Sequence, residues 1–236
     1  MYNESYSPTV ASPDVIDQGL RSYMIGVYNK MALALVVTAV TAWWGSTALL
    51  PLMKTPFWYA IIFAPLVAGL ALTFFMNRLS NTAAYIGFMI YAVLMGASLS
   101  SIFVVYTGVS IAKTFFISAA TFAAASLYGY TTGRDLTSMG SFLIMGVIGI
   151  CIASIVNIFL ASSMLAFIIS IVGVIAFTGL TAYDTQKLKE EYLSNGEVYG
   201  FDSPEKSSIF GALTLYLDAV NIFISLLQLL GDKKND

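Results

Sequence analysis

The sequence predicts an all-α membrane protein with seven transmembrane helices. Three observations support this fold class: 58% of the 236 residues are hydrophobic, 10% are charged, and the apolar residues gather in seven runs of about 20 or more. An average soluble domain has roughly 25% charged residues, and a soluble chain of this size could not hide so much apolar surface. Runs of this length cross a hydrocarbon core of about 30 Å as helices, which satisfy their own backbone hydrogen bonds.

The order of polar and apolar segments places each helix. Residues 1–23 are polar and lack the basic start of a secretory signal, so they predict an uncleaved, disordered cytoplasmic tail. The transmembrane domain is expected over residues 24–231, and residues 232–236 form a short charged tail. The seven predicted helices are 24–50, 57–76, 82–106, 111–130, 141–160, 164–184 and 209–230. A very tight turn at 161–163 joins the fifth and sixth helices, and a long polar connection, 185–208, joins the last two.

The basic residues predict the orientation of the chain. With seven spans, the amino terminus shares a side of the membrane with the connections between helices two and three, four and five, and six and seven. Seven of the eleven basic residues lie on that side, and four lie on the other. Because Lys and Arg accumulate in cytoplasmic loops, we expect a multi-pass bacterial inner-membrane protein with a cytoplasmic amino terminus and a periplasmic carboxyl terminus.

Composition excludes several classes of function. The chain has no histidine, which excludes a His-based catalytic triad and an imidazole pH sensor. It has a single cysteine, so neither an internal disulfide nor a cysteine-cluster zinc site can form. The eleven basic residues are scattered and the net charge is −2, so we expect no nucleic-acid partner.

Small residues predict close helix packing at two places. Ala92, Gly96 and Ser100 are spaced four apart in the third predicted helix, and Gly129 and Gly133 end the fourth. Small residues at this spacing let helix backbones approach closely in a membrane. The alternative is that glycine and alanine are simply common in membrane helices.

Asp218 is the clearest outlier among the apolar runs. It lies nine residues inside the last predicted helix, or about 14 Å along it. A charged carboxylate at mid-membrane costs about 2.5–3.5 kcal/mol on insertion scales. Asp218 also belongs to a polar seam of residues spaced three and four apart, which places them on one face of a helix. The seam residues are Gly211, Thr214, Asp218, Asn221, Ser225 and Gln228.

Asp184 is the second outlier and ends the sixth predicted helix. Thr181 lies on the same face, one turn earlier. Since the sixth and seventh helices are antiparallel and joined on the cytoplasmic side, Asp184 and Asp218 could meet. The alternatives are an interfacial acid with ordinary solvation at Asp184, and a seam that only joins helices through hydrogen bonds.

Two buried carboxyl groups in contact cannot both ionise cheaply, so they titrate as one coupled system. In a chain without histidine, such a pair is a natural switch near physiological pH. Carboxylates are also ligands that Ca²⁺ prefers, so Asp184 and Asp218 are candidate Ca²⁺ ligands as well. Apart from Ca²⁺ as a permeant ion, no cofactor is expected.

Three segments carry a family resemblance. AYDTQKL at 182–188, LTLYLDAVNIFISLL at 213–227 and SLYGYTTGRDL at 126–136 resemble the transmembrane Bax inhibitor motif family, and specifically its bacterial inner-membrane members. The resemblance covers nearly all of residues 20–231. It implies a bundle in which a central seventh helix is wrapped by the other six. It also implies a pH-sensitive calcium leak controlled by a hydrogen-bonded aspartate pair, here Asp184 and Asp218.

The resemblance also suggests gate partners. In some bacterial relatives an arginine just after the second span latches the closed pore. An ungapped match places Asn77 at that position, with Arg78 next to it. Arg78 and Asn77 are therefore candidate partners of the pair, together with the three intramembrane polar residues Thr181, Thr214 and Asn221.

Two other functions remain open from the sequence. An intramembrane aspartyl protease also pairs aspartates on consecutive helices, the first in a Tyr-Asp motif, as at Tyr183–Asp184. Its Gly-x-Gly-Asp motif is missing here, because Leu215, Tyr216 and Leu217 precede Asp218, and so is Pro-Ala-Leu. A non-conducting regulator that binds a membrane protease or quality-control partner is the other alternative. The leading hypothesis is a passive, pH-gated cation leak channel, which is not an enzyme and whose partners are the bilayer and Ca²⁺.

Overall fold

The computed structural model describes residues 13–195 and 203–234, and the regular secondary structure of these residues is helical. Within these two ranges, seven helices are long and apolar enough to cross a membrane. This confirms the predicted fold class. The elements are α1 (Pro13–Ala48), η1 (Leu52–Lys54), α2 (Phe57–Phe75), η2 (Met76–Arg78), α3 (Asn81–Leu99), α4 (Ile102–Val105), α5 (Gly108–Thr131), α6 (Thr137–Leu160), α7 (Ser163–Asn195) and α8 (Pro204–Leu230).

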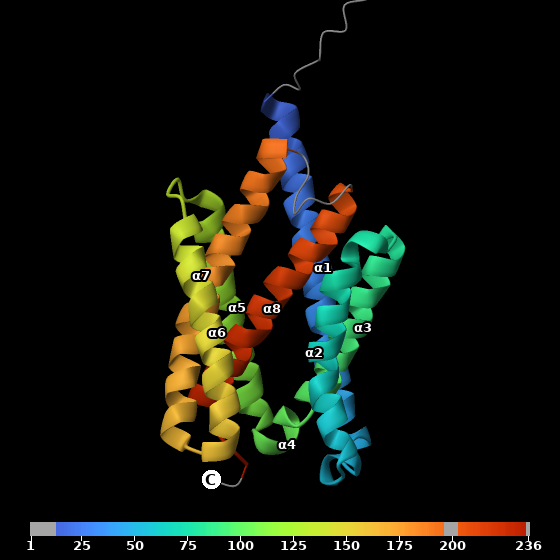
Figure 1. Ribbon diagram of the computed structural model, residues 1–236, viewed down its shortest axis with the longest axis vertical. Helices are drawn as coiled ribbons and strands as arrows, with labels where there is room; N and C mark the ends of the chain where they lie inside the picture. The colour runs from blue at the N-terminus through green and yellow to red at the C-terminus, as the bar shows by residue number, and fades with distance from the viewer. Residues whose placement is uncertain (1–12, 196–202, 235–236) are drawn as a thin grey trace, which may run out of the picture.

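The last helix, α8, lies at the centre of the bundle. Figure 1 shows it crossing obliquely between a group formed by α1, α2 and α3 and a group formed by α5, α6 and α7. In the most apolar stretch of α8, 67% of the residues are buried, against 6% to 28% in the other six spans. α8 packs directly against α1, α3, α5 and α7, while α2 packs on α3 and α6 packs on α7. The predicted central position of the last helix is therefore correct.

Several helix ends differ from the predicted boundaries. α1 begins at Pro13, so the second half of the predicted disordered tail is helical, while residues 1–12 lie outside the described residues. α7 continues to Asn195 and α8 begins at Pro204, so most of the predicted polar connection at 185–208 is helical too; residues 196–202 also lie outside the described part. The predicted third helix breaks after Leu99 into α3 and the short α4.

The extra turns of α1 and α7 form because they pack on each other beyond the apolar runs. The rings of Tyr23 and Tyr192 stack with their centroids 5.0 Å apart. Leu20 is buried, and the Tyr192 hydroxyl lies against Gly19, where a Cβ would come within 2.5 Å of it. Local hydropathy misses these turns because their stability comes from a contact between segments distant in sequence.

The predicted tight turn at 161–163 is present. α6 ends at Leu160 and α7 begins at Ser163. Ala161 makes this connection possible by adopting a left-handed backbone with φ 48°. The side chain of Asn157 accepts a hydrogen bond from the backbone N–H of Ser162 at 3.0 Å, which satisfies a donor inside the turn.

Close backbone packing occurs at two of the small-residue positions. A Cβ at Gly96 of α3 would lie 2.5 Å from the carbonyl oxygen of Thr38 in α1. A Cβ at Gly129 of α5 would overlap the carbonyl oxygen of Ala182 in α7. Gly133 has open space around it, so it has no such role. The first two glycines thus set the distances between α1 and α3 and between α5 and α7.

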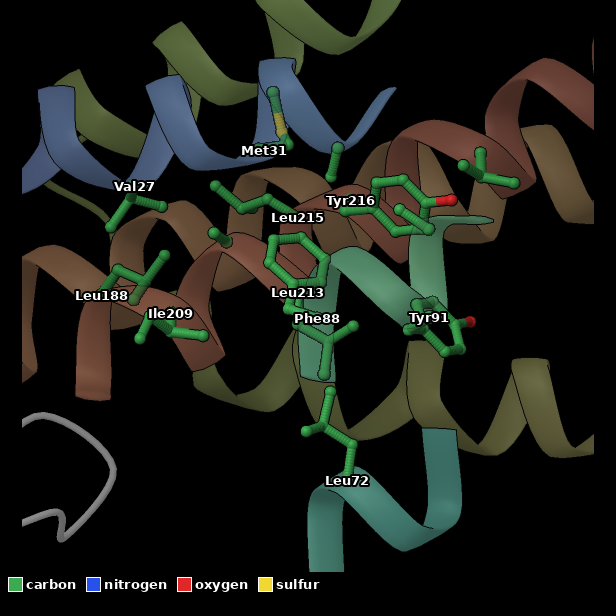
Figure 2. Packing of buried hydrophobic residues seen from close by; sticks show 14 of the residues in the cluster. Val27, Met31, Leu72, Phe88, Tyr91, Leu188, Ile209, Leu213, Leu215 and Tyr216 are labelled. Atoms are coloured by element: carbon green, nitrogen blue, oxygen red, sulfur yellow. The ribbon is translucent and has the colours of Figure 1, made fainter. Parts of the chain in front are cut away.

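The apolar core centres on the middle of α8. Tyr216 is fully buried, and its ring lies edge-on to Phe88 and Tyr91 of α3, with centroids 5.7 Å and 5.9 Å away. Its hydroxyl is hydrogen-bonded to the hydroxyl of Thr38 at 2.6 Å. Figure 2 shows Leu213, Leu215 and Tyr216 of α8 among side chains from α1 and α3. This aromatic cluster anchors α8 to α1 and α3.

Candidate functional site

The polar seam of α8 faces α7 along most of its length. A Cβ at Gly211 would lie 2.5 Å from Leu188, and a Cβ at Gly173 of α7 would lie 2.6 Å from the Ser225 hydroxyl oxygen. Further along, the hydroxyl of Ser170 donates to Gln228 at 2.7 Å. These contacts run in opposite order along the two helices, as antiparallel packing requires. The seam therefore lies between helices and not against lipid. This position is expected because polar groups are energetically unfavourable in hydrocarbon.

Asp184 and Asp218 meet in this interface and share a side-chain hydrogen bond. Asp218 is 4% exposed, and Asp184 is half-buried. A hydrogen bond between two carboxyl groups needs a proton on one of them. We therefore expect the pair to hold at least one proton. The Oδ2 atom of Asp218 has no hydrogen-bond partner among the described residues. The antiparallel register of α7 and α8 brings together two residues 34 positions apart.

Thr181, Thr214 and Asn221, which the sequence offered as gate partners, do not bind the pair. The Thr181 hydroxyl donates to the carbonyl oxygen of Phe177 at 2.8 Å. Thr214 donates to Phe210 in the same way, and the Asn221 amide donates to Leu217. Each of these bonds stays within its own helix, which is the usual local solution for a hydroxyl or amide in an apolar helix. All three line the α8 seam or its α7 neighbour without a bond to either aspartate.

Asn77 and Arg78 lie in η2, between α2 and α3, and both are exposed. The structure does not bring either of them to the aspartate pair. The neighbouring Asn81 ties this connection to α8 instead, because its side-chain amide donates to Ser203 at 3.1 Å and to Glu205 at 3.3 Å. The start of α8 is thus held to the α2–α3 connection by an amide that sequence reasoning missed.

A group of polar contacts fixes the carboxyl-terminal half of α7 beside the pair. Thr185 is fully buried and hydrogen-bonded to Ser126 of α5 at 3.0 Å, and Ser126 is hydrogen-bonded to Tyr28 of α1 at 2.6 Å. Gln186 accepts from the backbone N–H of Leu136 at 2.8 Å. The small residue Gly129 is the one sign of this packing in the sequence, because single hydroxyl groups on three different helices form no pattern that predicts their contact.

A polar cleft of about 410 Å³ lies between α7 and the start of α6, and neither Asp184 nor Asp218 is among its lining residues. Tyr183 and Gln186 line it on either side of Asp184 and Thr185 in the sequence, and the charged residues Lys187 and Glu191 line it further along. Lys187 and Glu191 form an ion pair at 3.7 Å. The cleft lies within one helical turn of Asp184 along α7, toward the end of the bundle where α1 begins.

The pair offers two carboxylates to a metal ion. Within residues 13–195 and 203–234 there is no group of three or more His, Cys, Asp or Glu side chains that could hold one. Calcium sites use about six to eight oxygen ligands. The pair would supply only part of such a ligand set, so Ca²⁺ binding by Asp184 and Asp218 stays a prediction.

Comparison with known proteins gives one consistent result. The sequence profile of the family described as "Inhibitor of apoptosis-promoting Bax1" matches residues 20–235. An uncharacterised protein of Rickettsia prowazekii (strain Madrid E) is 48% identical over 235 residues, covering 96% of each chain. The inner membrane protein YbhL of Escherichia coli (strain K12) is 45% identical over 222 residues, covering 92% of this chain and 94% of its own. A protein of Caulobacter vibrioides is 42% identical, with coverage of 99% and 98%.

Proposed function

Because this chain belongs to the Bax inhibitor-1-like family of membrane proteins, we propose that it is a pH-sensitive passive leak channel for Ca²⁺, gated by Asp184 and Asp218. The observation that carries the proposal is the hydrogen-bonded carboxyl pair between α7 and the central helix. A membrane-buried pair of acids is costly, and such residues usually mark ion or proton pathways.

The seven spans and the likeness to YbhL make this a multi-pass inner membrane protein. We place the amino terminus in the cytoplasm because most basic residues lie on its side of the membrane. Fusions of alkaline phosphatase and of a fluorescent protein to the carboxyl terminus test this orientation. The phosphatase should be active and the fluorescent protein dark; the reverse result would contradict the proposed orientation.

In the proposed mechanism, the shared proton holds α7 and α8 together. When that proton leaves, the hydrogen bond is lost, and two negative charges face each other in a site where Asp218 is 4% exposed. Both effects favour separation of the helices and hydration of the carboxylates. Lys187 and Glu191 also act electrostatically on Asp184, with opposite signs. We therefore propose that leak rises as pH rises through the titration of the pair.

The polar cleft beside Tyr183 and Gln186 is the proposed cytoplasmic entrance. Its lining residues Tyr183 and Gln186 flank Asp184 and Thr185 in the sequence, and further along α7 the seam is closed by the packing of Gly173 against Ser225. Separation of α7 from α8 would extend the cleft along the seam, whose side chains supply oxygen atoms to a passing cation. Oxygen ligands suit a hard cation such as Ca²⁺.

Calcium flux into proteoliposomes that hold a trapped indicator tests the proposal. Asp184→Asn and Asp218→Asn mimic the protonated acid, so both variants should leak slowly at every pH and lose the pH response of the wild type. Asp135→Asn is the matched control. Asp135 is exposed in the α5–α6 connection, and hydrogen bonds from Thr137 lower the pKa of its carboxyl, so it stays ionised across the neutral range. Wild-type pH profiles in both pair variants would contradict the proposal.

The same preparation separates the alternatives. A non-conducting regulator that binds other membrane proteins predicts no flux from the wild type at any pH. An aspartyl protease predicts cleavage of model transmembrane substrates that is lost in Asp218→Asn, since paired aspartates that share a proton are also the catalytic groups of those enzymes. The near-complete burial of Asp218 favours the channel, because hydrolysis needs water at the pair.

A further inference from the structure

A crevice between α1 and α5 lies apart from the α7–α8 seam. The two helices are joined by the hydrogen bond between Tyr28 and Ser126. Toward the end of the bundle where α5 begins, a cavity of about 470 Å³ lies between them, with walls from α1, α4, α5 and α8. Ligand sites in proteins usually enclose roughly 300–1,000 Å³, so this cavity is large enough for a ligand.

The lining of the cavity is apolar. Thr38 and Ser118 are the two lining residues with side-chain hydroxyls. Both hydroxyls already form hydrogen bonds with other protein groups. Ordered water needs two to four polar partners, so water is a poor occupant. Phe115 and Phe116 line the cavity and are 48% and 72% exposed, so the cavity opens onto the outer surface of α5. In a membrane that surface faces lipid.

Three exposed lysines lie at the same end of the bundle as the cavity. Lys113 lies on α5 between two lining positions, Ala112 and Phe115. The ammonium group of Lys234 donates to the carbonyl oxygen of Phe103, another lining residue, at 2.6 Å. Lys233 is held beside the α4–α5 connection by its backbone bridge to Tyr106.

The lysines of the carboxyl-terminal segment are fixed in place by the backbone. The N–H of Lys234 donates to the carbonyl oxygen of Val105 at 3.0 Å, and the N–H of Asp232 donates to the Ser110 hydroxyl at 2.9 Å. Gly231 permits this approach, because a Cβ there would lie 2.6 Å from the ring of Tyr106. Among the described residues of this segment and its neighbours, Lys113, Lys233 and Lys234 outnumber the acid Asp232, which makes this end of the cavity attractive to an anion.

We propose that this crevice binds one acyl chain of an anionic phospholipid, whose phosphate lies against Lys113, Lys233 and Lys234. The apolar cavity takes the chain, and the lysines extend from the helix end toward the headgroup region, where each contributes to the attraction of an anionic lipid. The opening beside Phe116 gives a lipid in the bilayer direct access.

Photolabelling of the full chain in vesicles tests the site. The vesicles contain phosphatidylcholine with a small fraction of phosphatidylglycerol that carries a diazirine in its acyl chain. The expected result is labelling concentrated on the α5 segment that holds Phe115 and Phe116, and on Phe103. A phosphatidylcholine probe with the same diazirine should label this segment several-fold less. Labelling spread evenly over the outer helices, or equal labelling by the two probes, would overturn the proposal.

Matched variants sharpen the test. Ala119→Phe fills the cavity and should remove most of the labelling, while Ala120→Phe adds the same side chain at an exposed position outside the lining. Lys113→Gln and Lys234→Gln should each lower phosphatidylglycerol labelling about fivefold. Lys54→Gln, in the α1–α2 connection at the same end of the bundle, should leave it unchanged. Should Ala119→Phe not fold, the exposed lysine variants decide: unchanged labelling in both contradicts the site.

Discussion

The two sides of α8 differ in what holds them to their neighbours. Toward α1 and α3, the helix is anchored by the fully buried ring of Tyr216, its two aromatic contacts and its bond to Thr38. Toward α7, Leu188 packs on Gly211, but the other contacts are made by the polar residues Ser225 and Gln228 and by a carboxyl pair whose hydrogen bond needs a proton. Packing of buried apolar groups varies little with pH, while a shared proton is lost within a few pH units. We therefore expect the side toward α1 and α3 to stay closed and the side toward α7 to respond to pH.

The largest expected effect comes from removing the anchor. Tyr216→Ala deletes a fully buried aromatic side chain and leaves a cavity beside Phe88, which should cost about 3–5 kcal/mol of unfolding free energy. Thermal unfolding of the purified protein measures the loss. Phe116→Ala is the control, because Phe116 is 72% exposed on α5 and its removal should change little. Equal effects of the two substitutions would mean that Tyr216 is not an anchor.

The next largest effect is expected when Asp218 is replaced and Tyr216 is left in place. Asp218→Leu should fold at wild-type yield or better, because a mid-membrane carboxyl carries an insertion cost of about 2.5–3.5 kcal/mol when charged. The variant should leak without any response to pH. Asn221→Leu lies on the same seam but removes only a bond to its own helix, so its pH response should persist. If Asp218→Leu gives no folded protein, the seam is structural.

A smaller change at Tyr216 tests whether the side of α8 that faces α1 and α3 takes part in the pH response. Tyr216→Phe keeps the ring and removes the hydroxyl bonded to Thr38, whose own hydroxyl still donates to the carbonyl oxygen of Ala92 at 2.9 Å. The cost should be about 0.5–1.5 kcal/mol of unfolding free energy. The flux–pH profile should keep its midpoint. A shifted midpoint would show that the anchored side also takes part in the response.

The smallest expected effect concerns the connection between α2 and α3. Arg78 is exposed, so Arg78→Gln should change neither unfolding nor the flux–pH profile. Asn81→Ala removes the amide that bonds to Ser203 and should cost about 0.5–1.5 kcal/mol. Parallel measurements of both variants check the contrast. Faster leak in Arg78→Gln alone would restore an arginine latch at this connection.

Sequence reasoning located the two aspartates because their signal is local. A carboxyl group inside an apolar run stands out whatever surrounds it, and the three-and-four spacing from Gly211 to Gln228 defines one helix face without reference to a partner. We expected this face of α8 to meet α7 because the two helices are consecutive and antiparallel. The contact between Asp184 and Asp218 fits that expectation, while their role as a pH sensor stays a prediction.

Helix ends and the remaining polar partners could not be found in this way. Whether residues 13–23 are helical depends on Tyr192, far along the chain, and the fixing of α7 depends on hydroxyl groups of Ser126 and Thr185 that carry no distinctive pattern. Arg78 lies exposed in η2, and its role as a latch stays a prediction, because its place in the sequence says nothing about its distance to the pair.

By itself, the sequence determined the number of spans, the all-helical class and the two acids in the membrane, because the bilayer imposes length and hydrophobicity on every crossing segment separately. Only the tertiary structure decided which face of α8 meets α7, which glycines let backbones touch, and where α1 and α5 leave a cavity. Lipid solvates all apolar faces equally well, so hydropathy cannot distinguish a face that packs from one that does not. Shape and a few hydrogen bonds make that choice.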